Sequence, residues 1–278
     1  MKANKELTVT TSVRPKKALG QHFLADANIA RKIAGSLTGT GQYNTVVEIG
    51  PGTGMLSRHL MEDKKFEWFG LDVDPSAISY LHERYPDKQN RIVLADFLSF
   101  DWEALLGDQQ VAVIGNFPYN ISSQIIFRVL KMRDKVPEVV GMFQKEVARR
   151  IASPPGSKEY GILSVLTQAF YDVEILFNVE PHVFVPQPKV QSTVIRCLRK
   201  ENQQLDCNER QFFAVVKTAF NQRRKTLRNS LKSIQVNWDM LPADMPGNRP
   251  ERLSVEDFVQ ITRQVSELAA HHHPGKKR

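Results

Sequence analysis

The stretch Val46-Val47-Glu48-Ile49-Gly50-Pro51-Gly52-Thr53-Gly54 decides the expected fold. Its first four residues have the pattern of a short buried strand, and this strand runs directly into a glycine-rich turn. The next segment, Met55 to Met61, has the pattern of a helix start. Glycines in such a turn let the backbone approach a ligand closely. The order of strand, glycine turn and helix therefore predicts a nucleotide-binding α/β domain.

The same alternation continues along the chain. Strands are predicted at 68–72, 92–96, 111–116 and 139–143, and helices at 76–85 and 124–131. Strands that alternate with helices imply right-handed crossovers and a parallel sheet. Ligands of such sheets bind at the carboxyl ends of the strands. The glycine turn, Asp72, Asp96 and Asn116 all lie at these ends, so we expect them to line one pocket.

The glycine turn alone does not identify the ligand. The pattern typical of NAD-binding proteins is G-x-G-x-x-G. Here the third glycine is Gly54, and Met55 stands where that pattern requires glycine. Asp72 follows Gly50 by 22 residues and can accept two hydrogen bonds from a ribose diol, a role that suits several nucleosides.

The motif Asn116-Phe117-Pro118-Tyr119 is more informative because it follows the fourth strand, at the expected pocket mouth. An exocyclic aromatic amine is a poor nucleophile, and a site that methylates it needs acceptors for its hydrogens. The Asn116 amide oxygen can be one acceptor, and Pro118 fixes the backbone that presents a carbonyl as a second. Tyr119 can stack on an extruded base. The motif therefore favours a methyltransferase acting on a base amine.

With these motifs the chain resembles the ribosomal RNA adenine dimethyltransferases, and among them the bacterial enzymes of the small subunit. The resemblance covers about Lys16 to Leu253. Besides the two motifs above, it is carried by the segments 18–24, 72–74, Asp96, 120–122 and 183–190. It implies a Rossmann-like class I S-adenosylmethionine methyltransferase domain with a smaller, mainly helical C-terminal domain. It also implies transfer of methyl groups to N6 of two adjacent adenosines in the 3′-terminal hairpin of 16S rRNA, within the immature small subunit.

The resemblance also implies roles for individual residues. The donor-binding residues are then His22, Leu24, Glu48, Gly50, Gly52, Asp72, Asp96 and Asn116. Asp72 binds the ribose hydroxyls, Asp96 binds the adenine amine, and His22 and Leu24 close the pocket from the N-terminal arm. The catalytic residues are Asn116, Pro118, Tyr119 and Phe184, with Tyr119 and Phe184 on either side of the target base. Three positions depart from the family pattern: His22 replaces Asn, Phe117 replaces Leu, and Asp72 replaces the common Glu.

No metal is expected in this chemistry, because the sulfonium of the donor already carries an activated methyl group. The two cysteines, Cys197 and Cys207, provide neither a disulfide framework nor a four-cysteine zinc site. No apolar run approaches the roughly 20 residues of a membrane helix, and the N-terminus lacks the apolar region of a signal peptide. We expect a cytoplasmic monomer without a membrane partner.

The formal net charge of +8 is unevenly distributed. Residues 1–33 carry a net +5, residues 34–198 a net −3 and residues 199–278 a net +6. Basic flanks around an acidic middle favour a polyanionic partner. The expected organisation is a basic arm at 1–33, a methyltransferase domain at 34–200, a helical RNA-binding or ribosome-binding domain at 201–270, and a disordered tail at 271–278.

The flanks contain the candidate RNA-binding residues. Lys16 and Lys17 lie in the arm just before Gly20 and Gln21, and Arg223, Arg224, Lys225 and Arg228 belong to the C-terminal region. Placed on one helix from Phe212 to Ile234, an apolar face is shared by Phe213, Val216, Phe220, Leu227 and Leu231. Beside this face lie Lys217, Arg224, Arg228 and Lys232, with Arg223 on its other edge. This arrangement predicts a helical domain that packs its apolar face and docks on an RNA backbone.

Three functions remain open at this point. The first is dimethylation of small-subunit RNA. The second is methylation of large-subunit RNA by an enzyme of the antibiotic-resistance kind, which shares the pocket motifs. The third is ribosome assembly in which binding matters more than catalysis. The basic C-terminal region and its run at 221–227 favour the first over the second.

Overall fold

The computed structural model describes residues 13–102 and 107–266. The chain divides into two compact units, Met1–Ala152 with Phe170–Glu201 and Ser153–Ala169 with Asn202–Arg278, which we call the N-terminal unit and the C-terminal unit. The division after Glu201 lies one residue beyond the end of the predicted methyltransferase domain at residue 200. The segment Ser153–Ala169 belongs to the C-terminal unit, whereas the predicted organisation includes it in the methyltransferase domain. It belongs there because Tyr160 is buried against Phe220 of the same unit.

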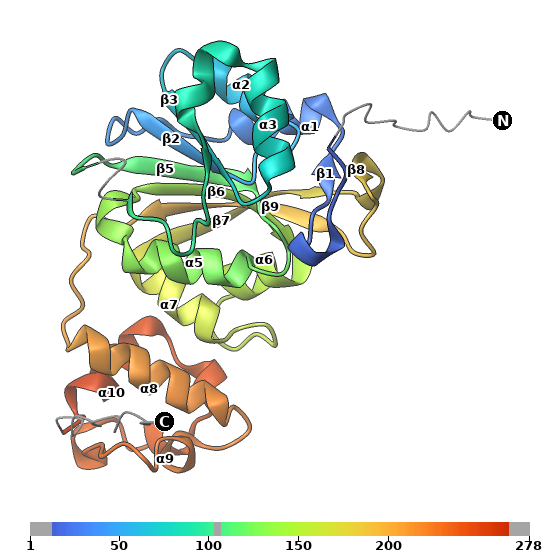
Figure 1. Ribbon diagram of the computed structural model, residues 1–278. Helices are drawn as coiled ribbons and strands as arrows, with labels where there is room; N and C mark the ends of the chain where they lie inside the picture. The colour runs from blue at the N-terminus through green and yellow to red at the C-terminus, as the bar shows by residue number, and fades with distance from the viewer. Residues whose placement is uncertain (1–12, 103–106, 267–278) are drawn as a thin grey trace, which may run out of the picture. The chain divides into compact units, whose positions relative to one another are not determined.

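A seven-stranded sheet in the order β4-β3-β2-β5-β6-β9-β7 forms the middle layer of the N-terminal unit (Figure 1). Its strands are β2 (Thr45–Ile49), β3 (Glu67–Asp72), β4 (Ile92–Leu94), β5 (Val111–Asn116), β6 (Glu138–Gln144), β7 (Tyr171–Val179) and β9 (Ser192–Arg199). The five strands from β4 to β6 in this order are parallel to one another, which confirms the predicted α/β fold. Strand β9 runs antiparallel to both β6 and β7. All five residues of β2 are buried, including Thr45 and Glu48, as expected of a central strand that is covered on both faces.

Helices cover both faces of this sheet (Figure 1). On one face lie α1 (Ala27–Ala34), α2 (Ser57–Glu62) and α3 (Pro75–Arg84), and on the other lie α5 (Ser122–Lys131) and α6 (Lys145–Ala152). Helix α3, predicted at 76–85, begins at Pro75, where the Asp74 side chain caps it. Side chains of Trp68, Leu81 and Ile114 belong to the buried core between the sheet and the first group of helices.

The N-terminal arm joins the sheet domain through a second, two-stranded sheet. Strand β1 (Phe23–Leu24) pairs antiparallel with β8 (Phe184–Val185). In this register Phe23 faces Val185 and Leu24 faces Phe184. A short 3₁₀ turn at Lys17–Leu19 precedes β1, and Gly20 then turns the chain with a φ of 64°. The arm is thereby attached to a segment more than 150 residues later in the chain.

The C-terminal unit is mainly helical, as predicted. It contains most of α7 (Ile162–Phe170), together with α8 (Glu209–Asn221), α9 (Leu227–Ser230) and α10 (Val255–Arg263). Helices α8 and α10 pack together, with the rings of Phe220 and Phe258 5.8 Å apart. Ser254 and Asp257 form a capping box at the start of α10.

The prediction of one helix from Phe212 to Ile234 is wrong. Helix α8 ends at Asn221, and a turn over 222–226 separates it from α9. The chain turns because Leu227 and Leu231 are buried and the Leu227 N–H donates to the Asn248 carbonyl at 2.8 Å. Tertiary packing therefore overrides a continuous amphipathic pattern. The predicted tail at 271–278 lies outside the described residues.

Within the described ranges, no helix combines the length and the apolar character that a membrane span requires.

A buried carboxyl group lies in the core of the N-terminal unit. Glu48 on β2 is 2% exposed, and its Oε2 accepts a hydrogen bond from Trp68 Nε1 at 2.9 Å. Burial raises the pKa of Glu48 to about 7, although the hydrogen bond from Trp68 lowers it in part. The folded protein therefore holds the Glu48 proton more tightly than the unfolded chain does.

This proton predicts how stability depends on pH. Between about pH 4.5, the ordinary value of a glutamate, and pH 7, the folded state binds more protons than the unfolded state, so rising pH destabilises the fold. Glu48→Gln keeps an acceptor for Trp68 and removes the titration. We expect the free energy of unfolding of the variant to rise relative to the wild type between pH 5 and pH 8, by up to roughly 3 kcal/mol.

Urea denaturation at several pH values measures this difference. Glu83→Gln, at an exposed position on α3, is the matched control, and its difference from the wild type should stay constant with pH. A constant difference for Glu48→Gln as well would show that Glu48 is ionised in the fold throughout the range.

Candidate functional site

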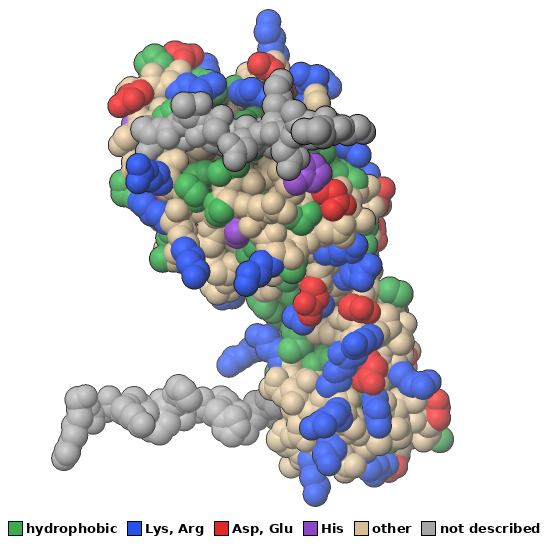
Figure 2. All heavy atoms as spheres, turned by 90° about the vertical axis from the view of Figure 1, so that its right-hand side faces the viewer, with side chains coloured by type: hydrophobic (Ala, Val, Ile, Leu, Met, Phe, Trp, Pro, Cys, Tyr) green, Lys and Arg blue, Asp and Glu red, His purple; other side chains and the backbone are tan. Residues whose placement is uncertain are grey.

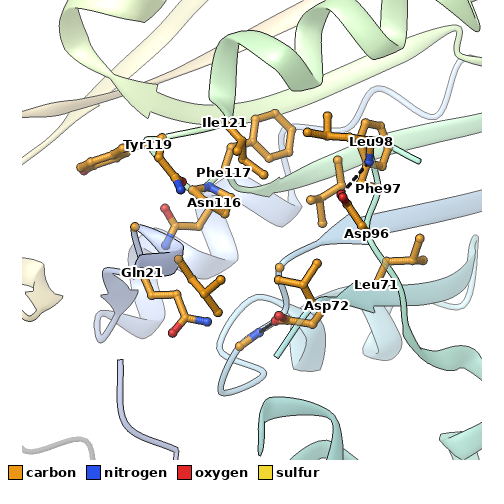
Figure 3. Close-up of a pocket in the computed structure, with 18 of the residues that line it drawn as sticks. Gln21, Leu71, Asp72, Asp96, Phe97, Leu98, Asn116, Phe117, Tyr119 and Ile121 are labelled. Carbon is orange, nitrogen blue, oxygen red and sulfur yellow. Dashed lines mark hydrogen bonds between the residues drawn. The ribbon is translucent and has the colours of Figure 1, made fainter. Parts of the chain in front are cut away.

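A pocket of about 300 Å³ lies at the carboxyl ends of β2, β3, β4 and β5. It collects eight of the predicted site residues: His22, Gly50, Gly52, Asp72, Asp96, Asn116, Pro118 and Tyr119. In Figure 3, Asp72 and Asp96 lie towards one side of the pocket, and Asn116 and Tyr119 lie towards the other. The strand-end residues that the sequence singles out are thus brought together in one place.

The Asp72 carboxylate forms the centre of the pocket floor. It is 5% exposed; Oδ2 accepts the N–H of Gly52 at 3.1 Å, and Oδ1 accepts the N–H of Asp74 at 2.9 Å. Burial raises the pKa of Asp72, and these backbone hydrogen bonds offset part of that rise. Each carboxylate oxygen has a further lone pair, so the group can still accept hydrogen bonds from a ligand.

The glycine turn needs backbone conformations that other residues rarely adopt. Gly50 has a φ of 67° and Gly52 a φ of 54°, both in the left-handed region. A Cβ atom at Gly52 would lie 2.9 Å from the Phe23 ring of the arm. Glycine at this position lets the arm and the turn meet at the pocket.

Asp96 lies in the loop after β4, which ends at Leu94, two residues earlier than predicted. The side chain is exposed, and its Oδ1 accepts the N–H of Leu98 at 2.9 Å. Phe97 and Leu98 line the pocket beside it, so an apolar surface flanks the carboxylate (Figure 3). An acceptor next to apolar side chains suits a heteroaromatic ring that carries an amine.

Asn116 joins the motif after β5 to the arm. Its Nδ2 donates to the His22 carbonyl at 2.8 Å, so the amide oxygen is the group left to accept from a ligand. The His22 ring lies 5.1 Å from the Tyr119 ring, and its Nδ1 donates to the Pro186 carbonyl at 2.7 Å. His22 therefore contacts the Asn116–Tyr119 motif through its backbone carbonyl and through its ring. The sequence did not reveal the ring contact.

Two further contacts hold the motif in place. The Tyr119 hydroxyl and the Ser192 hydroxyl are hydrogen-bonded at 2.6 Å. Phe117, which replaces the leucine of the family pattern, is 1% exposed, and its ring packs edge-on to that of Phe143 with centroids 5.1 Å apart. Gly141 accommodates this ring, because a Cβ there would lie 2.4 Å from it. The larger side chain is thus accepted by a glycine on the neighbouring strand.

Three predicted site residues do not line the pocket. Glu48 is bonded to Trp68 in the core, as described above. Leu24 and Phe184 are 4% and 3% exposed and face each other across the β1–β8 sheet. The ring beside Tyr119 in this structure is that of His22, and a role for Phe184 against the target base stays a prediction.

A second hollow, of about 480 Å³, shares Gly20, Gln21, His22 and Tyr119 with the pocket. Its other lining residues come from the arm, β6 and the segment after β8: Pro15, Lys17, Gln144, Pro186, Gln187, Pro188, Lys189 and Val190. This lining has two lysines and no carboxylate, whereas Asp72 and Asp96 line the pocket. The two hollows therefore differ in electrostatic character on either side of Tyr119.

The predicted RNA-binding residues have different surroundings. The Lys16 ammonium contacts the buried Asp74 carboxylate at 2.6 Å, whereas Lys17 is exposed. Arg223 is half-buried and donates to the Ser157 carbonyl at 3.4 Å. Arg224, Lys225 and Arg228 are exposed in and after the turn between α8 and α9. Figure 2 shows Lys and Arg side chains spread over the visible face of the C-terminal unit, with acidic side chains among them.

Among residues 13–102 and 107–266, no three His, Cys, Asp or Glu side chains group as a metal ion would require. The absence of a metal from the reaction stays a prediction.

Known proteins resemble this chain in sequence and in fold. The family described as Ribosomal RNA adenine dimethylase matches residues 13–265. "Ribosomal RNA small subunit methyltransferase A" of Flavobacterium johnsoniae is 52% identical over 254 residues, which cover 91% of this chain and 96% of the relative. The relative of the same name from Cytophaga hutchinsonii is 49% identical and covers 91% of this chain and 98% of its own.

Solved structures agree with these relatives. A dimethyladenosine transferase from Plasmodium falciparum has a TM-score of 0.71 and 25% identity, covering 86% of this chain and 96% of its own. The 23S rRNA methyltransferase ErmE has a TM-score of 0.69 and 23% identity, covering 87% and 99%, and this likeness concerns the fold alone. The family match over residues 13–265 and the 52% identity together show that the chain belongs to the ribosomal RNA adenine dimethylase family.

Proposed function

We propose that this chain transfers methyl groups from S-adenosylmethionine to N6 of two adjacent adenosines in the 3′-terminal hairpin of 16S rRNA, within the immature small subunit. The family and the small-subunit methyltransferases that share about half of its residues support the reaction and the kind of RNA. The observation that carries the assignment to this site is the convergence of Asp72, Asp96 and Asn116 on one pocket. We expect the enzyme to act as a cytoplasmic monomer.

The pocket residues fit the methyl donor. The turn at Gly50 and Gly52, with its positive φ angles, lets the backbone lie close to the methionine part of the donor. The spare lone pairs of Asp72 suit a ribose diol, and Asp96 beside Phe97 suits an adenine amine and ring. Two carboxylates in the lining also favour a ligand that carries a positive charge.

The donor, when bound, supplies a methyl group already activated by its positive sulfur. The work of the chain is then to place the adenine N6 in line with that methyl group. The Asn116 amide oxygen accepts a hydrogen bond from N6, and Pro118 fixes the following backbone. The new nitrogen–carbon bond forms as the carbon–sulfur bond breaks, and N6 loses one proton for each methyl group that it gains.

The second hollow supports the approach of the RNA from the far side of Tyr119. Its two lysines suit the phosphates that flank an extruded adenosine, while the Tyr119 ring, next to the His22 ring, offers a stacking surface. The electrostatic contrast between the hollows separates a site for a cationic donor from a path for a polyanion.

The two alternative functions, methylation of large-subunit RNA and ribosome assembly through binding, are supported to different degrees. The large-subunit assignment has only fold-level likeness, because the 23S methyltransferase structure is 23% identical, whereas the small-subunit relatives reach 52% over nearly the whole chain. A role in assembly through binding is compatible with the same site. Asn116→Ala distinguishes it: restored subunit maturation by this variant, in cells that lack the protein, would make binding the main role.

Methyl transfer is the direct test of the proposal. Incubation of the protein with tritiated S-adenosylmethionine and immature small subunits should give labelled N6,N6-dimethyladenosine in 16S rRNA. Asn116→Ala should lower the rate by about 10²-fold or more, because the acceptor that aligns N6 is lost. Mature large subunits in a parallel reaction are the control, and label confined to their RNA would contradict the small-subunit assignment.

The exposed basic residues after α8 supply a second test. Each phosphate contact contributes about 0.7 to 0.9 to the slope of log K against log salt concentration. Replacing Arg224, Lys225 and Arg228 with Ala should therefore reduce that slope by about 2 for binding to small subunits, measured by filter binding. Changing Lys64, Lys65 and Lys88 of the N-terminal unit to Ala removes the same charge as a control. Equal slopes for the wild type and the first variant would mean that these residues do not contact RNA.

A further inference from the structure

Asp74 is a fully buried carboxylate outside the pocket lining. It caps α3, and its Oδ1 accepts hydrogen bonds from the Ser76 N–H at 2.9 Å and the Ser76 hydroxyl at 2.6 Å. A helix cap usually lies at the surface in water, whereas this side chain is 0% exposed. A buried charge is stable only when charged or hydrogen-bonding groups surround it. The segment that covers Asp74 must therefore provide such groups.

The N-terminal arm provides these partners. The Lys16 ammonium lies 2.6 Å from Asp74 Oδ1, and Gln21 Nε2 lies 3.4 Å from Oδ2. Gln21 Oε1 also accepts the Lys16 backbone N–H at 2.8 Å, so the two arm residues are joined to each other. Burial raises the pKa of Asp74, but the hydrogen bonds from Lys16, Ser76 and Gln21 outweigh it and lower the pKa to about 2. The Asp74 carboxyl that contacts Lys16 is therefore ionised at every physiological pH.

The segment held in this way is a wall of the pocket. All five residues from Leu19 to Phe23 line it. The segment is also anchored at its ends, because Val13 and Phe23 form a buried cluster with Ala77, and Phe23 and Leu24 pair with β8. Between these anchors, Lys16 and Gln21 hold the arm onto the start of α3.

Asp74 is also linked to the pocket floor. Its backbone N–H donates to the Asp72 carboxylate, which in turn accepts the N–H of Gly52. Asp72, at the pocket floor, and Asp74, which holds the arm at the pocket wall, therefore lie in the same turn and are joined by a hydrogen bond.

We propose that Asp74 is a positioning residue that latches the arm, residues 16–22, across the donor pocket through Lys16 and Gln21. Lys16 then serves the donor site and not the RNA. This inference rests on the proposed function, since it takes the pocket as the donor site. Two methyl transfers to one adenosine need two donors, so the product S-adenosylhomocysteine must leave between them, and opening of this latch sets the rate of that exchange.

Asp74→Asn tests the latch, because Asn is as good a helix cap as Asp but carries no charge. Hydrogen exchange of the free protein, followed by mass spectrometry, measures the arm and α3 separately. We expect exchange in the segment 18–24 to rise at least threefold, with exchange in 75–84 unchanged. If exchange in α3 rose as much as exchange in the arm, or if exchange in the arm did not rise, Asp74 would only cap the helix.

The release of S-adenosylhomocysteine measures the consequence for the pocket. By stopped-flow displacement, both Asp74→Asn and Lys16→Met should raise its dissociation rate by three- to tenfold. The double variant should be no faster than the faster single variant, because the two residues act through one contact. Lys88→Met, which removes a surface lysine paired with Asp87, should leave the rate unchanged.

The outcomes separate the two claims. No binding of S-adenosylhomocysteine to the wild type would overturn the donor site itself. Binding to the wild type with equal dissociation rates in all variants would overturn the latch and leave the donor site intact. Additive effects of Asp74→Asn and Lys16→Met would also overturn it, because they would place the two residues in separate interactions.

Discussion

The rest of the site depends on the hydrogen bonds that the buried Asp72 carboxylate accepts from Gly52 and Asp74. Through them, one side chain at the end of β3 fixes the glycine turn after β2 and the turn that begins α3. Since the carboxylate is 5% exposed, its charge is stabilised mainly by these backbone groups. These hydrogen bonds offset part of the free-energy cost of burying the carboxylate, and they hold it in a fixed position as an acceptor at the pocket floor.

Much of the site could be predicted from sequence because each of its parts follows a strand of a parallel sheet. The glycine turn, Asp72, Asp96 and the motif at Asn116 lie within a few residues of strand ends that their apolar patterns reveal, and topology brings those ends together. The fold class follows from the same alternation of strands and helices.

What could not be predicted depends on contacts between distant segments. Glu48 is adjacent to the glycine turn in sequence, but it points into the core and bonds to Trp68. Lys16 is predicted from sequence to contact RNA, yet its side chain pairs with Asp74, which is 58 residues away. The helix expected to continue to Ile234 ends at Asn221 because burial of Leu227 requires a turn, although the apolar periodicity runs on.

The central claim is that the pocket of Asp72, Asp96 and Asn116 binds the methyl donor, and calorimetric titration of S-adenosylhomocysteine into Asp96→Ala tests it most directly. Asp96 is exposed, and among the hydrogen bonds of the described residues its side chain accepts only the Leu98 N–H, so replacing the side chain leaves the backbone of the pocket in place. We predict an affinity about 10-fold or more below the wild type, since a charged hydrogen bond is lost. Asp63→Ala, which removes the same kind of bond to Lys65 outside the pocket, should bind as the wild type does. Equal affinity of Asp96→Ala and the wild type would contradict the assignment.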